Sequence, residues 1–97
     1  MFQITFTPEA IEDLRWFIKE DRKAIMEEIE TQLRYQPAVE TRNRKRLRPN
    51  QLAEWELRFA GFRVFFAVEE EDRLIQVIAV GYKEGSCLFI RGREYVL

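Results

Sequence analysis

The first six residues alternate between apolar and polar side chains, with Phe2, Ile4 and Phe6 separated by Gln3 and Thr5. This period of two predicts a half-buried strand over residues 2–6. The pattern changes after Phe6, where we expect the strand to end.

A helix start follows at Thr7, because a threonine side chain can cap the first turn and Pro8 suits the first helical position. Glu9 complements the positive end of the helix dipole. Apolar residues then recur at helical spacing: Ala10, Ile11, Leu14, Phe17 and Ile18. We expect this stripe to face the core.

A second helical pattern begins near Asp21, which we expect to cap that helix. Its apolar face consists of Ile25, Met26, Ile29 and Leu33. The helix should end before Pro37, because the residue before a proline avoids the helical conformation. The two helices therefore form a hairpin with one apolar side, followed by a loop over residues 36–43.

Beyond this loop the pattern returns to a period of two. We expect strands at 55–59, 62–68 and 74–80, an extended segment at 44–48, and further β structure at 88–90 and 94–96. The acidic run at 69–72 and Gly92 are expected in turns. The order β-α-α-β-β-β with a short β tail predicts the α+β class, with two helices on one face of an antiparallel sheet. A chain of 97 residues fits a single domain over residues 1–97.

Ala60-Gly61 separates two of these strands and is typical of a two-residue hairpin loop, although a longer loop would spare Ala60 a positive φ. In the two-residue register, Trp55 pairs with Phe66, Leu57 with Val64 and Phe59 with Phe62. These pairs form one apolar face against the helices. The opposite face carries Arg58 across from Arg63 and Glu56 across from Phe65.

Composition narrows the chemistry. The chain has no histidine, which removes the commonest metal ligand and the commonest general base at neutral pH. We therefore expect no metal and no cofactor. Cys87 is the only cysteine, so no internal disulfide forms. No apolar run is long enough to span a bilayer and no signal pattern precedes the first strand, which favours a cytoplasmic location without membrane contact.

Charge is distributed unevenly along the chain. Residues 42–63 hold seven cations and only two carboxylates, although the whole chain has a net charge of −1. Charge sorted in this way favours a polyanion-facing patch on an otherwise acidic body. The densest part is a candidate RNA-binding segment formed by Arg42, Arg44, Lys45, Arg46 and Arg48.

Two arginines directly opposite each other in a hairpin repel. Arg58 and Arg63 are therefore either a solvated pair partly neutralised by Glu56 or a phosphate site in which two guanidinium forks provide planar, bidentate recognition. The residues alone leave both interpretations open.

The order of motifs resembles the RelE/ParE superfamily of bacterial type II toxins. The resemblance rests on Thr7-Pro-Glu-Ala10 with the helical hairpin, Trp55-Glu-Leu-Arg58, Gly61-Phe-Arg-Val-Phe-Phe66, and Ile78-Ala-Val-Gly81 followed by Lys83. It implies a curved antiparallel sheet with the active face on its concave side. It also implies a cognate antitoxin that wraps and neutralises the toxin, and contact with operator DNA only through that antitoxin.

RelE-like members cleave mRNA on the ribosome without a metal, by attack of a ribose 2′-OH on the adjacent phosphate. The resemblance implies a catalytic set of Arg63, Glu56, Arg58 and Lys83, in which Arg63 matches the arginine that stabilises the scissile phosphate. Lys83 stands where those enzymes place a cation. Glu54 and Glu56 occupy the places of their lysines, and Phe89 or its neighbours the place of their tyrosine.

These departures leave three interpretations open. The chain is either an endoribonuclease, a ParE-like inhibitor of DNA gyrase without RNA cleavage, or a weakly toxic protein whose main property is antitoxin binding. Loss of the lysines and the tyrosine favours the second, and the near-neutral net charge, unusual for a ribosome-binding toxin, favours the third.

Overall fold

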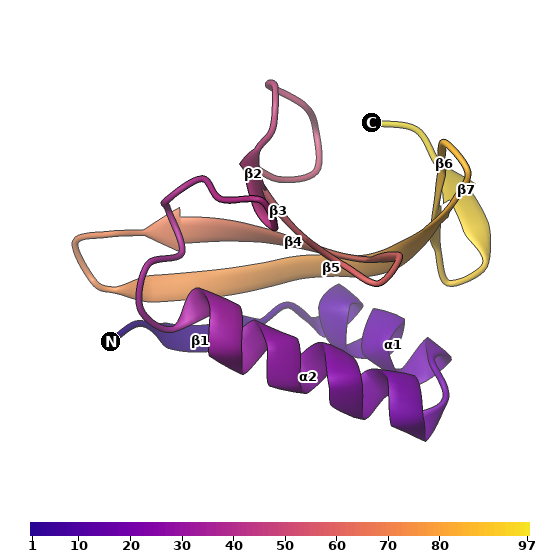
Figure 1. Cartoon of the computed structure of the whole chain (residues 1–97), viewed down its shortest axis with the longest axis horizontal. Helices are drawn as coiled ribbons and strands as arrows, with labels where there is room; N and C mark the ends of the chain where they lie inside the picture. Colours follow the sequence, from indigo (N-terminus) through magenta and orange to yellow (C-terminus); the bar gives the residue numbers. More distant parts are fainter.

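The computed structural model describes residues 1–97, in which two helices pack on one face of an open, mainly antiparallel sheet (Figure 1). The elements in chain order are β1 (Gln3–Phe6), α1 (Pro8–Trp16), α2 (Lys19–Leu33), β2 (Arg44–Arg46), β3 (Trp55–Phe59), β4 (Phe62–Glu69), β5 (Leu74–Glu84), β6 (Cys87–Ile90) and β7 (Arg93–Tyr95). The sheet order is β2-β3-β4-β5-β6-β7, and β1 lies beside β5. The predicted α+β class and helix arrangement are confirmed.

One strand departs from the expected antiparallel sheet. β1 pairs with β5 in parallel, with Gln3 opposite Leu74 and Phe6 opposite Val77. A parallel pair needs a long connection, and here both helices and three strands lie between the two partners in the chain. The alternation in residues 2–6 predicted a strand correctly, but it contains no information about strand direction.

The link between the helices differs from the sequence prediction. α2 begins at Lys19 with Ile18 at the capping position, so Asp21 lies in the first turn and does not cap the helix. The helix can start early because Arg22 donates from Nε to the carbonyl oxygen of Leu14 (3.2 Å) and from Nη2 to that of Phe17 (3.0 Å). These bonds satisfy carbonyls at the end of α1 and leave only two residues between the helices.

The buried face of α1 is narrower than predicted. Ala10, Leu14 and Phe17 are buried, but Ile11 and Ile18 are exposed. Asp13 is buried instead, because its carboxylate caps the backbone of β5, as described below. On α2, Ile25, Ile29 and Leu33 are fully buried, as the pattern predicted.

The main core lies between the helices and the sheet. Trp55, Leu57, Val64 and Phe66 face the helices and belong to one cluster of buried side chains with those of α1 and α2. The rings of Trp55 and Phe66 stack with centroids 6.1 Å apart. The predicted hairpin register is confirmed. The turn has two residues with positive φ, 47° at Ala60 and 86° at Gly61, so the longer loop is wrong.

The face away from the helices is called the concave face here, because β6 and β7 curl over it (Figure 1). A second, smaller cluster of buried side chains lies there: Phe65, Ala79 and Leu88. The loop between β2 and β3 contributes side chains that pack on this cluster, namely Leu47, Leu52 and Ala53. Ile90 and Tyr95 also pack on it. The loop and the β6–β7 hairpin therefore stand on either side of the concave face.

β5 is longer than the predicted strand and continues through Gly81 to Glu84. A Cβ at position 81 would lie 2.4 Å from the carbonyl oxygen of Phe89, so only glycine lets β6 approach β5 this closely. The two predicted tail segments form a hairpin, in which Arg91 and Gly92 make the turn with positive φ. Neither helix combines the length and the apolar character that crossing a membrane requires.

Candidate functional site

The centre of the concave face is a buried carboxylate surrounded by cations. Glu56 is only 2% exposed, and its Oε1 accepts a hydrogen bond from Nε of Arg58 at 2.5 Å. Arg58 lies directly across from Arg63 on the neighbouring strand, as the sequence predicted. We call this group, with the two lysines described below, the Glu56 site.

Arg63 is the more buried of the two arginines. One of its guanidinium nitrogens, Nη1, donates to the carbonyl oxygen of Phe62 at 2.8 Å, whereas the buried Nε has no hydrogen-bond partner. Burial lowers the pKa of Arg63, the charge of Glu56 opposes that shift, and Arg58 adds to it. Arg63 is half-buried, and a guanidinium whose donors are not all used within the protein can bind an anion.

Two lysines share this face by strand register. Lys45 pairs with Glu56 across β2 and β3, and direct partners in an antiparallel pair point to the same side. Lys83 lies two residues beyond Gly81, which is the β5 partner of Arg63, so alternation places it on the same face. Lys45 was predicted as part of the RNA-binding segment, and the structure places it beside the predicted catalytic set.

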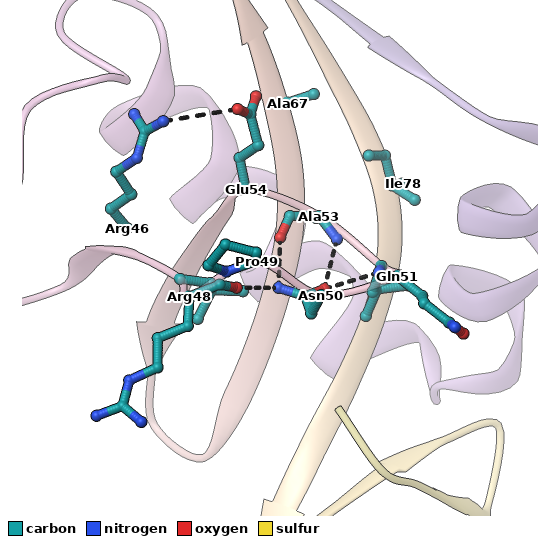
Figure 2. Close-up of a pocket in the computed structure, with 11 residues that line it drawn as sticks. Arg46, Arg48, Pro49, Asn50, Gln51, Ala53, Glu54, Ala67 and Ile78 are labelled. Carbon is teal, nitrogen blue, oxygen red and sulfur yellow. Dashed lines mark hydrogen bonds and ion pairs between the residues drawn. The ribbon is translucent and has the colours of Figure 1, made fainter.

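The rest of the RNA-binding segment divides between exposed and engaged side chains. Arg42 and Arg48 are exposed and make no ion pair, while Arg46 lies 3.6 Å from Glu54 and over the ring of Trp55. Figure 2 shows Arg48 extending away from a pocket of about 450 Å³, which Ala67 and Ile78 of the sheet line together with the loop. The Asn50 side chain holds this loop through bonds to the backbones of Arg48, Leu52 and Ala53.

Arg44 is held by the protein. Its Nη1 donates to the carbonyl oxygen of Gln32 at 2.7 Å and its Nε to that of Val39 at 3.0 Å. Burial lowers its pKa. The guanidinium thus joins the end of α2 to the loop that follows, and few of its donors remain for a phosphate.

Replacing Arg44 by alanine is expected to lower the free energy of unfolding by about 1–2 kcal/mol, because two backbone carbonyls lose charged donors. The matched control is Arg48→Ala, whose exposed side chain makes no hydrogen bond or ion pair and whose loss should cost less than about 0.5 kcal/mol. Urea unfolding followed by circular dichroism measures both. Equal stability of the two variants would contradict the structural role of Arg44.

The aromatic side chains near the C-terminus lie on different faces. Phe89 stacks on Tyr82 with ring centroids 5.4 Å apart, and Tyr82 stacks on Trp16 of α1 at the same separation. Phe89 therefore belongs to the helix side of the sheet. Tyr95 pairs with Leu88 and packs on the cluster around Phe65, so this phenol lies on the concave face.

Asp13 is a buried carboxylate that the sequence analysis did not select. It is 2% exposed, and its Oδ2 accepts a hydrogen bond from the backbone N–H of Val80 at 3.0 Å. Burial raises the pKa of Asp13, and the hydrogen bond from Val80 and the charge of Arg91 oppose that shift. A carboxylate between Ala10 and Leu14, inside an apolar helical stripe, was the available signal.

The raised pKa of Asp13 predicts a pH effect on stability. Between the unfolded and the folded pKa the folded state holds more protons, so stability falls as pH rises through this window. We expect wild type to lose unfolding free energy relative to Asp13→Asn as the pH is raised from below 4 towards neutrality. Urea titrations of both proteins across this range measure the difference, and a difference that grows in favour of wild type would contradict the assignment.

A family model describing the ParE toxin of type II toxin–antitoxin systems, parDE, matches residues 4–85. This segment contains both helices and all the residues of the Glu56 site. Among curated proteins no match was found.

Solved structures share the fold. The RelBE2 toxin–antitoxin complex from Mycobacterium tuberculosis is similar with a TM-score of 0.73 and 21% identity, covering 84% of this chain and 98% of that chain. The isolated RelE toxin of E. coli is similar with a TM-score of 0.70 and 20% identity, covering 89% of this chain and 88% of that chain. A YoeB–YefM complex from Staphylococcus aureus is similar with a TM-score of 0.63 and 23% identity, covering 87% of this chain and 99% of that chain. At these identities the similarity demonstrates a common fold.

Proposed function

The chain belongs to the ParE toxin family of type II toxin–antitoxin systems, within the RelE/ParE superfamily, and we propose that it is a metal-independent, ribosome-dependent mRNA endoribonuclease neutralised by an antitoxin. The observation that supports this activity is the Glu56 site, where a buried carboxylate is bonded to Arg58 and lies opposite Lys45, with Arg63 across from Arg58 and Lys83 beyond Arg63 on the same face. Such a protein acts in the cytoplasm, where its mRNA substrate is found.

The reaction forms a bond between the ribose 2′-oxygen and phosphorus and breaks the bond from phosphorus to the 5′-oxygen. Glu56 takes the proton of the 2′-OH as general base, held in place by Arg58. Arg63 and Lys83 neutralise the charge that develops on the phosphoryl oxygens, and the unused Nε of Arg63 is one donor for them. Tyr95 is the phenol on this face and can supply the proton to the 5′-oxygen.

The exposed basic residues beside this site hold the polyanion. Arg42 and Arg48 are solvent-exposed beside β2, Arg46 is exposed on β2 over the ring of Trp55, and Lys45 lies opposite Glu56. Contacts of this kind to phosphates carry little sequence information and weaken as salt increases. They grip rRNA or mRNA while Arg63 acts on one phosphate.

Expression in bacteria followed by primer extension on cellular mRNAs tests the proposal. We expect growth arrest together with new mRNA 5′ ends that require translation of the message. Growth arrest with intact mRNAs would remove the endoribonuclease assignment. Normal growth together with a tight antitoxin complex would instead indicate a weakly toxic antitoxin-binding protein.

The second candidate is inhibition of DNA gyrase in the manner of ParE toxins. It is favoured by the family model and by Glu54 and Glu56, which stand where RelE-like enzymes carry lysines. A supercoiling assay with purified gyrase separates the two activities. Unaffected supercoiling at a large excess of this protein would exclude the gyrase candidate.

Glu56→Gln separates the role of base from that of counter-ion. If Glu56 is the base, we expect cleavage to fall by about 10²–10⁴-fold while RNA binding is kept or strengthened, because a negative charge near the phosphate is removed. Single-turnover cleavage and RNA affinity are measured on the same variant. The matched control is Glu54→Gln, a neighbouring exposed carboxylate. Unchanged cleavage in Glu56→Gln would leave Glu56 as a counter-ion only.

A further inference from the structure

A second pocket lies at the edge of β5 and shares Tyr95 with the concave face that carries the Glu56 site. β1 pairs with β5 only as far as Val77, and β6 pairs with it only from Tyr82 onward. On this edge of β5 the interval between them has no neighbouring strand, while β4 pairs with β5 on the other edge. Thr7 and Asp13 cap its backbone, with Thr7 Oγ1 donating to the carbonyl oxygen of Ile78 at 3.1 Å. A pocket of about 490 Å³ opens at this interval, between α1 and the β6–β7 hairpin.

Asp13 is the polar group at the base of this pocket. Its Oδ2 is used by the N–H of Val80. Its Oδ1 is buried and accepts no hydrogen bond, although Nε of Arg91 lies 3.0 Å away. The Arg91 side chain is about half exposed, so this cation is positioned beside the carboxylate without satisfying its free lone pairs.

The walls of the pocket define the ligand. Leu52, Ile78 and Ile90 are apolar, and Tyr95 adds an aromatic ring. Carboxylates of Glu9 and Glu94 lie at the pocket together with that of Asp13, against the guanidinium groups of Arg91 and Arg93. Carboxylates outnumber cations, so the pocket disfavours a phosphate and favours a cationic donor with an apolar stem.

We propose that this pocket is a socket for an arginine side chain of the bound antitoxin, whose guanidinium replaces Arg91 at Oδ1 of Asp13. This proposal rests on the proposed function, because it assigns a contact to the antitoxin that the proposed function includes. Arginine fits better than lysine, since its planar fork can donate to Asp13 and a second carboxylate while its methylene stem lies on Leu52 and Ile90. Buried arginines of this kind are frequent energetic centres of interfaces.

The first test is an NMR titration in which N-acetyl-arginine methylamide, the probe, is added to the whole toxin. It is repeated for each variant. The backbone amide of Val80 reports on Asp13 because the two are hydrogen-bonded. We expect a saturable shift of this resonance in wild type and none with the citrulline analogue. Asp13→Asn, which keeps an acceptor for Val80, should abolish it, and the control Glu27→Gln, which removes an exposed carboxylate on α2 outside the pocket, should retain it.

The substitution Arg91→Gln should change probe binding in the opposite direction from Asp13→Asn. It removes the competing guanidinium, so the probe should bind more tightly than to wild type, whereas a purely structural role of Asp13 predicts no such gain. Absence of any saturable shift in both wild type and Arg91→Gln would overturn the proposal. Because this titration involves neither RNA nor ribosomes, its failure is distinct from failure of the nuclease assignment.

The second test measures the complex with the antitoxin encoded beside the toxin gene. We expect Asp13→Asn to weaken that complex by at least about tenfold, mainly through faster dissociation, and the control Glu27→Gln, outside the pocket, to change it by less than about threefold. Unchanged antitoxin affinity in Asp13→Asn overturns the proposal. If the same variant instead changes which base precedes the cleavage site, the pocket reads a nucleobase and not an antitoxin side chain.

Discussion

Replacing Arg63 by alanine is expected to abolish growth arrest and to reduce RNA cleavage by at least about 100-fold. Arg63 is the half-buried cation of the Glu56 site, and its Nε has no acceptor within the protein. In the proposed reaction this donor meets the phosphoryl oxygen on which charge accumulates. A group that is most useful in the transition state affects the rate more than it affects binding.

The conservative variant Arg63→Lys sharpens this test. A lysine keeps the charge but loses the planar fork, so we expect partial recovery of cleavage, well below that of wild type. Lys23→Ala is the matched control, because Lys23 is an exposed cation on α2 that makes no ion pair. Circular dichroism verifies that each variant is folded. Full toxicity of Arg63→Ala would show that the assigned role is wrong.

Replacing Phe66 by alanine is expected to lower the free energy of unfolding by about 3–5 kcal/mol. The ring is fully buried, stacks on Trp55 and contacts the core formed with α1 and α2. Truncation leaves a cavity that a sheet fixed on both sides by neighbouring strands cannot close. Since domains of this size are stable by about 5–15 kcal/mol, much of the reserve is lost.

Phe59→Ala is the matched control for this effect. Phe59 belongs to the same hairpin and contacts the same core, but it is only partly buried, so its loss should cost clearly less. Urea unfolding monitored by tryptophan fluorescence measures both variants. Equal destabilisation by the two substitutions would contradict the burial difference between these positions.

Some features of the Glu56 site follow from local pattern. The alternation in residues 55–59 and 62–68 defined the hairpin register, and that register alone placed Arg58 opposite Arg63 and Glu56 opposite Phe65. Side chains of a strand alternate strictly between faces, so a correct turn determines every facing pair. The helix face of Ile25, Ile29 and Leu33 was predictable for a similar reason.

Other features depend on contacts between distant parts of the chain. Arg44 looked like its cationic neighbours, yet it binds carbonyls that α2 and the following loop bring to it. Asp21 was a plausible helix cap, but Arg22 satisfied the end of α1 and let α2 start earlier. Propensity and charge do not report which backbone groups will lie near a side chain.

The sequence by itself therefore determined the α+β class, the helical hairpin, the facing arginines and the basic segment that precedes them, because these depend on periodicity and on residues close in the chain. Only the tertiary structure decided that β1 runs parallel to β5, that Glu56 is buried, and that Asp13 lies at the base of a pocket. Each of these depends on which elements meet across long sequence separations, such as the 67 residues between Asp13 and Val80. Such meetings are set by the packing of the whole core, which no local pattern encodes.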